Sequence, residues 1–209
     1  MLSNTGNILL IGSIVSTFLI IYFTYQSLKE RSFQIKKNII YWSFLQITFV
    51  IASFLLLIFA FVFSDFSLLA VYQNSHTAKP LFYKISGVWG NHEGSMLLWI
   101  NIMVLFSYLF FVFNNKTNSV LSLYTLIVQN ILILGFLVFL ISDSNPFFKI
   151  LPIPIEGLGL NPILQDPALA IHPPLLYLGF VGSSIYFSAA VAAILSNSDG
   201  KNFALSIKK

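Results

Sequence analysis

The sequence predicts an all-α integral membrane protein with five transmembrane helices. Hydrophobic residues make up 57% of the 209 residues and charged residues only 9%, whereas a soluble domain carries about a quarter charged residues. Five runs without a charged side chain are long enough to cross a bilayer, which takes about 20 mostly apolar residues. Because unpaired backbone is costly in lipid, such runs form helices. The expected helices span residues 8–27, 39–63, 95–113, 120–141 and 173–195.

The basic residues indicate how these helices are oriented in the membrane. Three lie in the loops on one side, Lys79, Lys84 and Lys149. The other side carries more, namely Lys29, Arg31, Lys36, Lys37, Lys116, Lys201, Lys208 and Lys209. The positive-inside rule therefore predicts an N-terminus outside and a C-terminus in the cytosol or matrix. No basic residue precedes Lys29, so we expect an uncleaved first helix and not a signal peptide.

This orientation puts both long loops, residues 64–94 and 142–171, on the outer side. All three histidines, His76, His92 and His172, fall on that side as well. Any chemistry of this protein is therefore expected at its outer face.

Composition also excludes several classes of site. The chain has no cysteine, which excludes thiol catalysis, disulfides, cysteine-bound zinc, iron–sulfur clusters and covalent attachment of a c-type haem to this chain. The net charge of +4 is small, and no basic face exists outside the short loops, so nucleic acid is not an expected partner. Membrane lipid is.

The first outer loop ends in a dense polar segment, GVWGNHEGSMLLW, at residues 87–99. Either Asn91 or Ser95 could cap the following helix, and Glu93 would be favoured by the helix dipole. The simpler reading is a helix start with tryptophan anchors at the membrane interface. Polar groups are expensive at this boundary, so we also consider a ligand-binding surface. Its candidate residues are Trp89, Asn91, His92 and Glu93.

His172 is the sharpest candidate for a ligand to a metal. It precedes Pro173, and proline is favoured in the first turn of a helix, so we expect His172 to flank the N-terminus of the fifth helix. A neutral imidazole can bind iron while a neighbour orients its second nitrogen. Gln165 and Asp166 are close enough in sequence to do this. The alternative is a capping or interfacial histidine.

Two further loop features leave alternatives open. His76 lies in the polar stretch QNSHTAKP, where a solvated loop histidine is the preferred interpretation. Residues 144–169 are rich in proline and glycine but also apolar, which favours a ledge on the outer surface over a free linker. Such a ledge could receive a flat hydrophobic cofactor or pack on another subunit.

Two long segments, WGNHEGSMLLW at 89–99 and NPILQDPALAIHPPLLYLGFVG at 161–182, closely resemble the CcmF family of cytochrome c-type biogenesis proteins. NrfE, CcmC and CcsA are more distant relatives. The resemblance covers roughly residues 5–205, so we take residues 1–205 as the N-terminal transmembrane part of such a protein and 206–209 as a tail. It implies a multi-pass protein of the bacterial cytoplasmic or mitochondrial inner membrane that takes part in System I cytochrome c maturation.

The resemblance implies a cofactor and partners. Haem would arrive from holo-CcmE and pass, non-covalently bound as a b-type haem in transit, to the Cys-x-x-Cys-His motif of an apocytochrome c. CcmH and, in some systems, CcmI would assist. By position, His172 matches an outer-side histidine of the family that serves as axial haem ligand. The segment around His92 matches a family motif with a structural or haem-approach role.

The family's tryptophan-rich WWD segment, its second outer histidine and its two transmembrane histidines are absent from these residues. The chain therefore resembles the N-terminal third of the family. We expect it to need the downstream CcmF portion as a partner and not to act as a complete haem lyase alone. Two other function classes stay open: a small transporter or channel subunit with outer histidines, and a structural assembly subunit without its own site.

Overall fold

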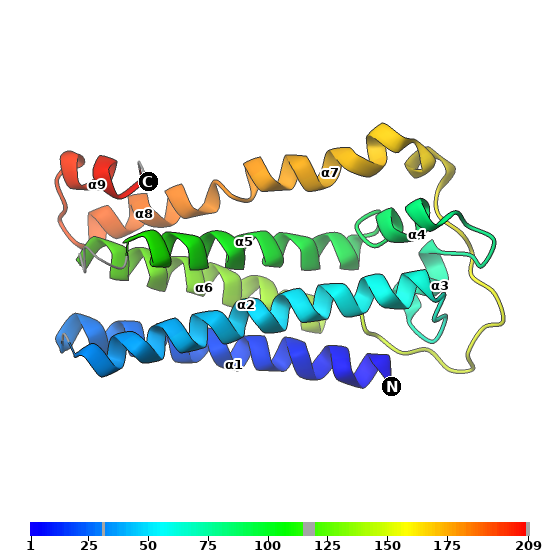
Figure 1. Ribbon diagram of the computed structural model, residues 1–209, viewed down its shortest axis with the longest axis horizontal. Helices are drawn as coiled ribbons and strands as arrows, with labels where there is room; N and C mark the ends of the chain where they lie inside the picture. Colours follow the sequence, from blue (N-terminus) through cyan, green and yellow to red (C-terminus); the bar gives the residue numbers. More distant parts are fainter. Residues whose placement is uncertain (31, 115–119, 208–209) are drawn as a thin grey trace.

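The computed structural model describes residues 1–30, 32–114 and 120–207, and within them the chain is helical with no strand. Its elements are α1 (Leu2–Lys29), α2 (Phe33–Val62), α3 (Leu69–Asn74), α4 (Leu81–Gly87), α5 (His92–Asn114), α6 (Val120–Ser142), η1 (Pro162–Gln165), α7 (Pro167–Phe180), α8 (Ser184–Leu195) and α9 (Gly200–Ile207). The long helices lie side by side in an elongated bundle (Figure 1).

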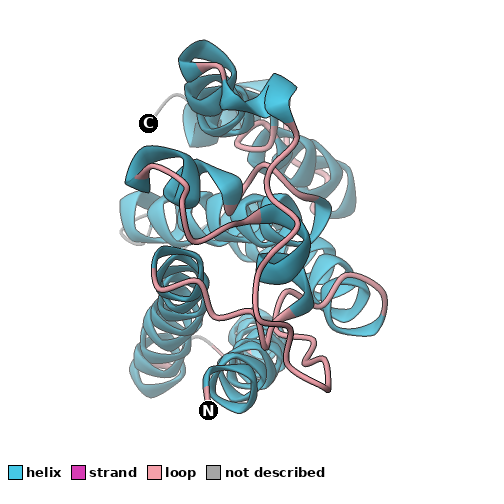
Figure 2. Ribbon diagram, turned by 90° about the vertical axis from the view of Figure 1, so that its right-hand side faces the viewer, coloured by secondary structure: helices cyan, strands magenta, loops and turns pink. Residues whose placement is uncertain are grey.

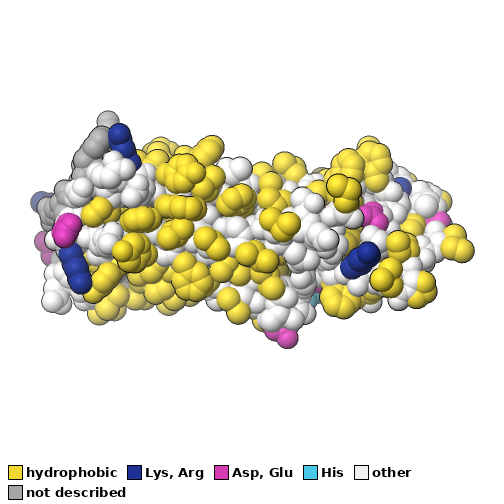
Figure 3. Space-filling view, turned by 90° about the horizontal axis from the view of Figure 1, so that it is seen from below, with side chains coloured by type: hydrophobic (Ala, Val, Ile, Leu, Met, Phe, Trp, Pro, Cys, Tyr) yellow, Lys and Arg dark blue, Asp and Glu magenta, His cyan; other side chains and the backbone are white. Residues whose placement is uncertain are grey.

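Among the described residues, five segments are long and apolar enough to cross a membrane, which confirms the predicted all-α class with five candidate spans. They are α1, α2, α5, α6 and the segment formed by α7 and α8. Hydrophobic side chains cover the middle of the face in Figure 3, and charged ones gather toward its two ends. Arg31, Lys116, Lys208 and Lys209, which entered the orientation argument, lie outside the described residues.

The fifth span differs from its prediction, because it begins at Pro167 and breaks between α7 and α8. The break falls at Gly182, where the chain runs close to α5. A Cβ atom there would lie 2.3 Å from the carbonyl oxygen of Leu178 and 2.7 Å from the ring of Phe106. Glycine is thus required at this close contact.

The two long loops fold together at one end of the bundle. We call residues 63–91 and 143–166 the loop cap, and Figure 2 shows it in front, with its connections crossing the helix ends. The segments predicted as loops contain the short helices α3, α4 and η1 and the start of α7. Backbone N–H groups of one loop bond carbonyls of the other: Leu69 to Phe148 (2.9 Å), Ile150 to Ser67 (3.0 Å), Leu158 to Tyr72 (2.8 Å) and Gly159 to Ser75 (3.0 Å).

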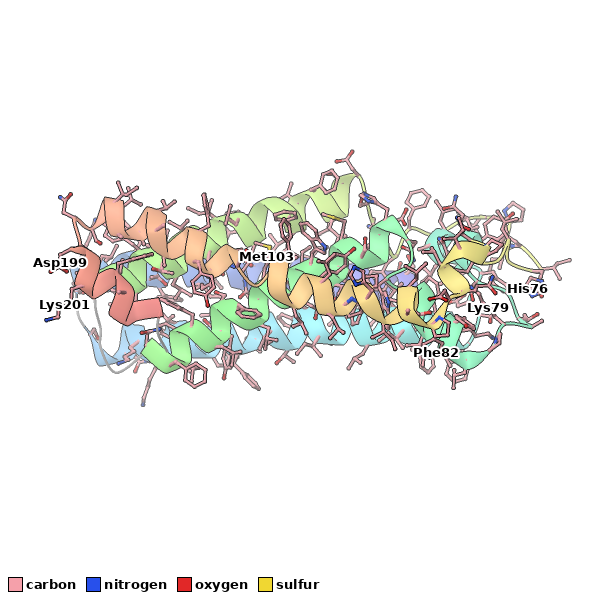
Figure 4. All side chains as sticks on the ribbon, turned by 90° about the horizontal axis from the view of Figure 1, so that it is seen from above. His76, Lys79, Phe82, Met103, Asp199 and Lys201 are labelled. Carbon is pink, nitrogen blue, oxygen red and sulfur yellow. The ribbon has the colours of Figure 1, made fainter. Side chains whose placement is uncertain are left out.

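The opposite end of the bundle carries α9 and the turn between α1 and α2. His76, Lys79 and Phe82 lie at the loop cap, whereas Asp199 and Lys201 lie at the far end (Figure 4). The chain continues directly after Asp199 as the short helix α9.

The bundle core contains a buried chain of polar side chains that crosses four helices. Gln46 of α2 donates from Nε2 to Thr17 Oγ1 of α1 (2.7 Å) and to Asn130 Oδ1 of α6 (2.9 Å). Asn130 in turn donates from Nδ2 to Ser107 Oγ of α5 (3.3 Å). All four side chains are buried, so these bonds satisfy groups that would be costly in lipid.

The neighbouring residue of α6, Gln129, makes a second set of bonds on the side of α8. Its Nε2 donates to Ser184 Oγ (3.0 Å) and to the carbonyl of Met103 (3.4 Å), and its Oε1 accepts from Ser188 Oγ (2.7 Å). Two adjacent amides thus make α6 the central helix, which packs against α1, α5 and α8. This arrangement holds α8 firmly while α7 continues beyond it toward the loop cap.

Candidate functional site

Asp166 determines where α7 begins. Its side-chain Oδ1 accepts hydrogen bonds from the backbone N–H groups of Ala168 (2.8 Å) and Leu169 (3.0 Å), and Pro167 occupies the first helical position. This is the usual combination of an N-cap residue and a first-turn proline. His172 therefore lies inside α7, and the prediction that it flanks the N-terminus of the helix is wrong. Asp166 and the two prolines after the histidine are competing signals for a helix start, and the prediction followed the prolines.

Pro173 and Pro174 consequently lie in the interior of α7. Proline has no N–H to donate to the carbonyl four residues earlier, so the carbonyls of Leu169 and Ala170 lack the usual donor four residues later in the helix. The indole Nε1 of Trp89 donates to the Ala170 carbonyl at 2.7 Å. The two sequence segments that carried the candidate residues are thus joined by one hydrogen bond.

Asn91, one of the two residues predicted as possible caps, is the residue that caps α5. Its Oδ1 accepts from the N–H of Gly94 (2.8 Å), and its Nδ2 donates to the carbonyls of Gly87 (2.7 Å) and Val88 (3.1 Å). The turn is tight, since a Cβ on Gly94 would lie 1.6 Å from the Val88 carbonyl oxygen. Asn91 therefore holds the end of α4 against the start of α5, and with it the backbone next to Trp89.

His92 and Glu93 begin α5 directly after this cap. His92 is exposed, and its ring meets Phe139 of α6 edge-on at 6.3 Å between centroids. Glu93 is partly buried in the first turn, where the helix dipole favours a carboxylate. A contribution of these two residues to ligand approach stays a prediction.

His172 presents an exposed imidazole on a helix whose outer face is apolar. Within the described residues its ring makes no hydrogen bond, and no group of three metal-binding side chains gathers anywhere. Gln165 bonds the carbonyl of Leu160 (3.0 Å), and Asp166 is occupied as a cap, so these bonds do not bring either side chain to His172. Their support of the ligand, and that of the partly buried Pro173, stay predictions.

These residues fit one side of a haem. The porphyrin nitrogens already occupy four positions on the iron, so a protein adds only axial ligands such as histidine. A free imidazole beside the exposed Ile171 and Leu175 offers such a ligand together with apolar surface. The same arrangement lacks the clustered carboxylates and imidazoles that bind an isolated metal ion.

His76 lies in the loop cap, in agreement with its interpretation as a loop histidine. Its Nδ1 accepts from the N–H of Ala78 (3.1 Å), and its Nε2 lies 3.9 Å from Glu156 Oε2. Hydrogen bonds from the Thr77 hydroxyl, and then from the N–H of Gly157, lower the pKa of Glu156 to about 2. Burial, together with the charge of Lys84, lowers the pKa of Lys79 to about 8.

Sequence reasoning missed two features that shape this site. One is the hydrogen bond from Trp89 to Ala170, which the missing N–H of Pro174 could have indicated, although not the donor. The other is the two sets of buried interhelical bonds, one made by Gln46 and Asn130 and one by Gln129. Amide side chains in the middle of otherwise apolar spans were its signal.

Comparisons with known proteins agree with the resemblance of the two segments. The family model described as "Cytochrome C assembly protein" matches residues 89–209. The cytochrome c-type biogenesis protein CycK of Bradyrhizobium diazoefficiens is 54% identical over 150 residues, which are 72% of this chain and 23% of the relative. CcmF of Escherichia coli is 43% identical over 148 residues, 70% of this chain and 23% of the relative.

The chain thus spans about a quarter of the length of these curated relatives. A solved structure named "Cytochrome c Heme Lyase CcmF" superimposes with a TM-score of 0.77 and 24% identity over 94% of this chain and 31% of its own. At that identity the match shows a shared fold.

Proposed function

Because the chain belongs to the cytochrome c assembly protein family, we propose that it takes part in the biogenesis of c-type cytochromes as part of a membrane haem lyase. The single observation that carries this proposal is the imidazole of His172, exposed and without a partner among the described residues, inside the segment that the family model matches. Five apolar spans suit a multi-pass protein of the bacterial cytoplasmic or mitochondrial inner membrane.

The loop cap would face the periplasm or the intermembrane space. Support comes from the basic residues. Lys29 ends α1, Lys36 and Lys37 lie near the start of α2, and these helix ends lie at the same end of the bundle as Lys201 (Figures 1 and 4). Under the positive-inside rule that end faces the cytosol or matrix. The N-terminus of the chain would then lie outside, beside the loop cap.

His172 would provide one axial nitrogen to a non-covalently held haem. Bound haem supplies an iron whose ligands and surroundings tune its redox state. This chain's own residues orient the ligand: Asp166 caps α7, Trp89 bonds Ala170, and Asn91 holds the turn that carries Trp89. A second axial ligand would come from outside these residues, in the downstream CcmF portion.

The handover would run from holo-CcmE to the Cys-x-x-Cys-His motif of an apocytochrome c, assisted by CcmH and, in some systems, by CcmI. Thioether bonds need two thiols, and this chain has none. The apocytochrome therefore supplies both sulfur atoms, and the residues described above bind and orient the haem.

The test compares two histidine variants in the same complex. The chain is co-expressed with the downstream portion of a CcmF relative, purified, and its haem content is measured from the Soret band. His172→Ala should lower the haem content, and His76→Ala is the matched control, because His76 bonds within the loop cap. Unchanged haem content in His172→Ala would disprove the ligand assignment.

A further inference from the structure

α7 carries the candidate ligand but packs lightly on the rest of the bundle. Of its 14 residues only Ala170 is buried. α8, by contrast, is held to α6 through the bonds of Gln129 to Ser184 and Ser188. The direction in which His172 points therefore depends on a small number of contacts made by α7 itself.

Two tryptophans of one segment hold α7 on either side of His172. Before it, the Trp89 indole donates to the Ala170 carbonyl. After it, the ring of Trp99 contacts those of Tyr177 and Phe180, with centroids 5.5 Å and 6.2 Å apart. The acyl chains of lipid can replace an apolar ring contact, but they cannot donate a hydrogen bond.

The contact at Trp89 is therefore the directional one. Pro174 leaves the Ala170 carbonyl without a helical donor, and Ala170 is only 4% exposed. A buried carbonyl without a donor is unfavourable. Trp89 can donate to the Ala170 carbonyl only when this turn of α7 has one position along the helix axis and one rotation about it, relative to α5.

We propose that Trp89 is a positioning residue for His172: its indole N–H supplies the hydrogen bond that Pro174 withholds from Ala170, and so fixes the turn of α7 that bears the imidazole. The inference rests on the proposed function in one respect, namely the haem that His172 binds. The bond itself can be tested without haem.

The first experiment is a double-mutant cycle read by hydrogen–deuterium exchange of α7 in the haem-free protein. Trp89→Phe keeps an aromatic ring but removes the N–H, and should raise exchange of the α7 amides roughly tenfold. Pro174→Ala restores a donor four residues after Ala170. In the double variant Trp89→Phe should then have little effect.

A matched control uses the neighbouring proline. Pro173→Ala restores a donor to Leu169, which Trp89 does not contact, so it should leave the effect of Trp89→Phe in place. Equal rescue by Pro173→Ala and Pro174→Ala, or no rescue by either, would overturn the proposal, as would unchanged exchange in Trp89→Phe.

The second experiment measures positioning in the haem-loaded complex. Trp89→Phe should speed haem dissociation and weaken the Soret band, and Pro174→Ala should restore both in the double variant. If His172→Ala weakens haem binding but Trp89→Phe does not, the positioning inference is wrong and the ligand assignment stands. If His172→Ala has no effect, the ligand assignment fails, and with it the inferred link to haem, although the exchange cycle still decides the bond.

Discussion

Asn130→Leu is expected to destabilise the bundle by removing interhelical hydrogen bonds while keeping a side chain of similar size. Asn130 is fully buried on α6. It accepts from Gln46 Nε2 at 2.9 Å and donates to Ser107 Oγ at 3.3 Å. Both bonds connect different helices, and the substitution removes both at once.

The magnitude follows from these two bonds. Interhelical hydrogen bonds in membrane proteins contribute about 0.6 kcal/mol each on average, which gives a loss of about 1.2 kcal/mol. Gln46 keeps its bond to Thr17, so the larger penalty for a buried donor without any partner is avoided. Gln129→Leu removes three interhelical bonds and should cost about 1.8 kcal/mol by the same reasoning.

The assay is unfolding in mixed micelles with increasing sodium dodecyl sulfate, followed by circular dichroism. Asn101→Leu is the control, because the side chain of Asn101 bonds the Leu97 carbonyl of its own helix. We expect the order Gln129→Leu, Asn130→Leu, Asn101→Leu, from most to least destabilised. If Asn101→Leu is as destabilising as Asn130→Leu, the cost does not come from the bonds between helices.

Three further predictions follow from the structure. Gly94→Ala should lower the free energy of unfolding by about 3 kcal/mol through overpacking, because its Cβ would lie 1.6 Å from a backbone carbonyl oxygen. Gly135→Ala is the control, since open space surrounds it, and should be neutral or stabilising by up to about 1 kcal/mol. The thermal unfolding midpoints of the two variants test this. Asp166→Ala should cost about 1 kcal/mol and increase amide exchange in the first turn of α7 but not of α5; exchange that stays unchanged contradicts the cap. Because the pKa of Glu156 lies below its ordinary value of 4.5, its contact with Thr77 should be intact above pH 4.5 and lost as the pH falls toward 2. A pH titration of the Thr77 amide resonance tests this. The transition should be absent in Glu156→Gln.

The spans could be predicted from the sequence because hydropathy and length depend only on local composition. The fourth helix, expected at 120–141, is observed at Val120–Ser142. The start of the fifth was misjudged by six residues, since Pro167 and Asp166 compete with Pro173 as start signals and only the capping geometry decides. The short helices α3 and α4 could not be predicted, because α3 depends on backbone bonds to the second loop and α4 on packing against α2 and α7.

The features of the candidate site also fall into those that a local sequence pattern predicts and those that depend on the folded chain. Asn91 as a cap and Glu93 in a first turn are local patterns, and the structure contains both. The contact of Trp89 with Ala170 joins residues far apart in sequence, so no local pattern contains it. That His172 has no partner in the part of the chain that the structure describes is likewise a property of the folded surface.

Pairing between the two loops also imposes an order on assembly. The first loop is synthesised long before the residues that bond Ser67, Leu69, Tyr72 and Ser75. Its backbone groups therefore lack these partners until α6 has been inserted and the second loop has been synthesised. The loop cap is therefore a late product of biogenesis, and the interval before it closes is when the nascent chain is most open to incorrect pairing.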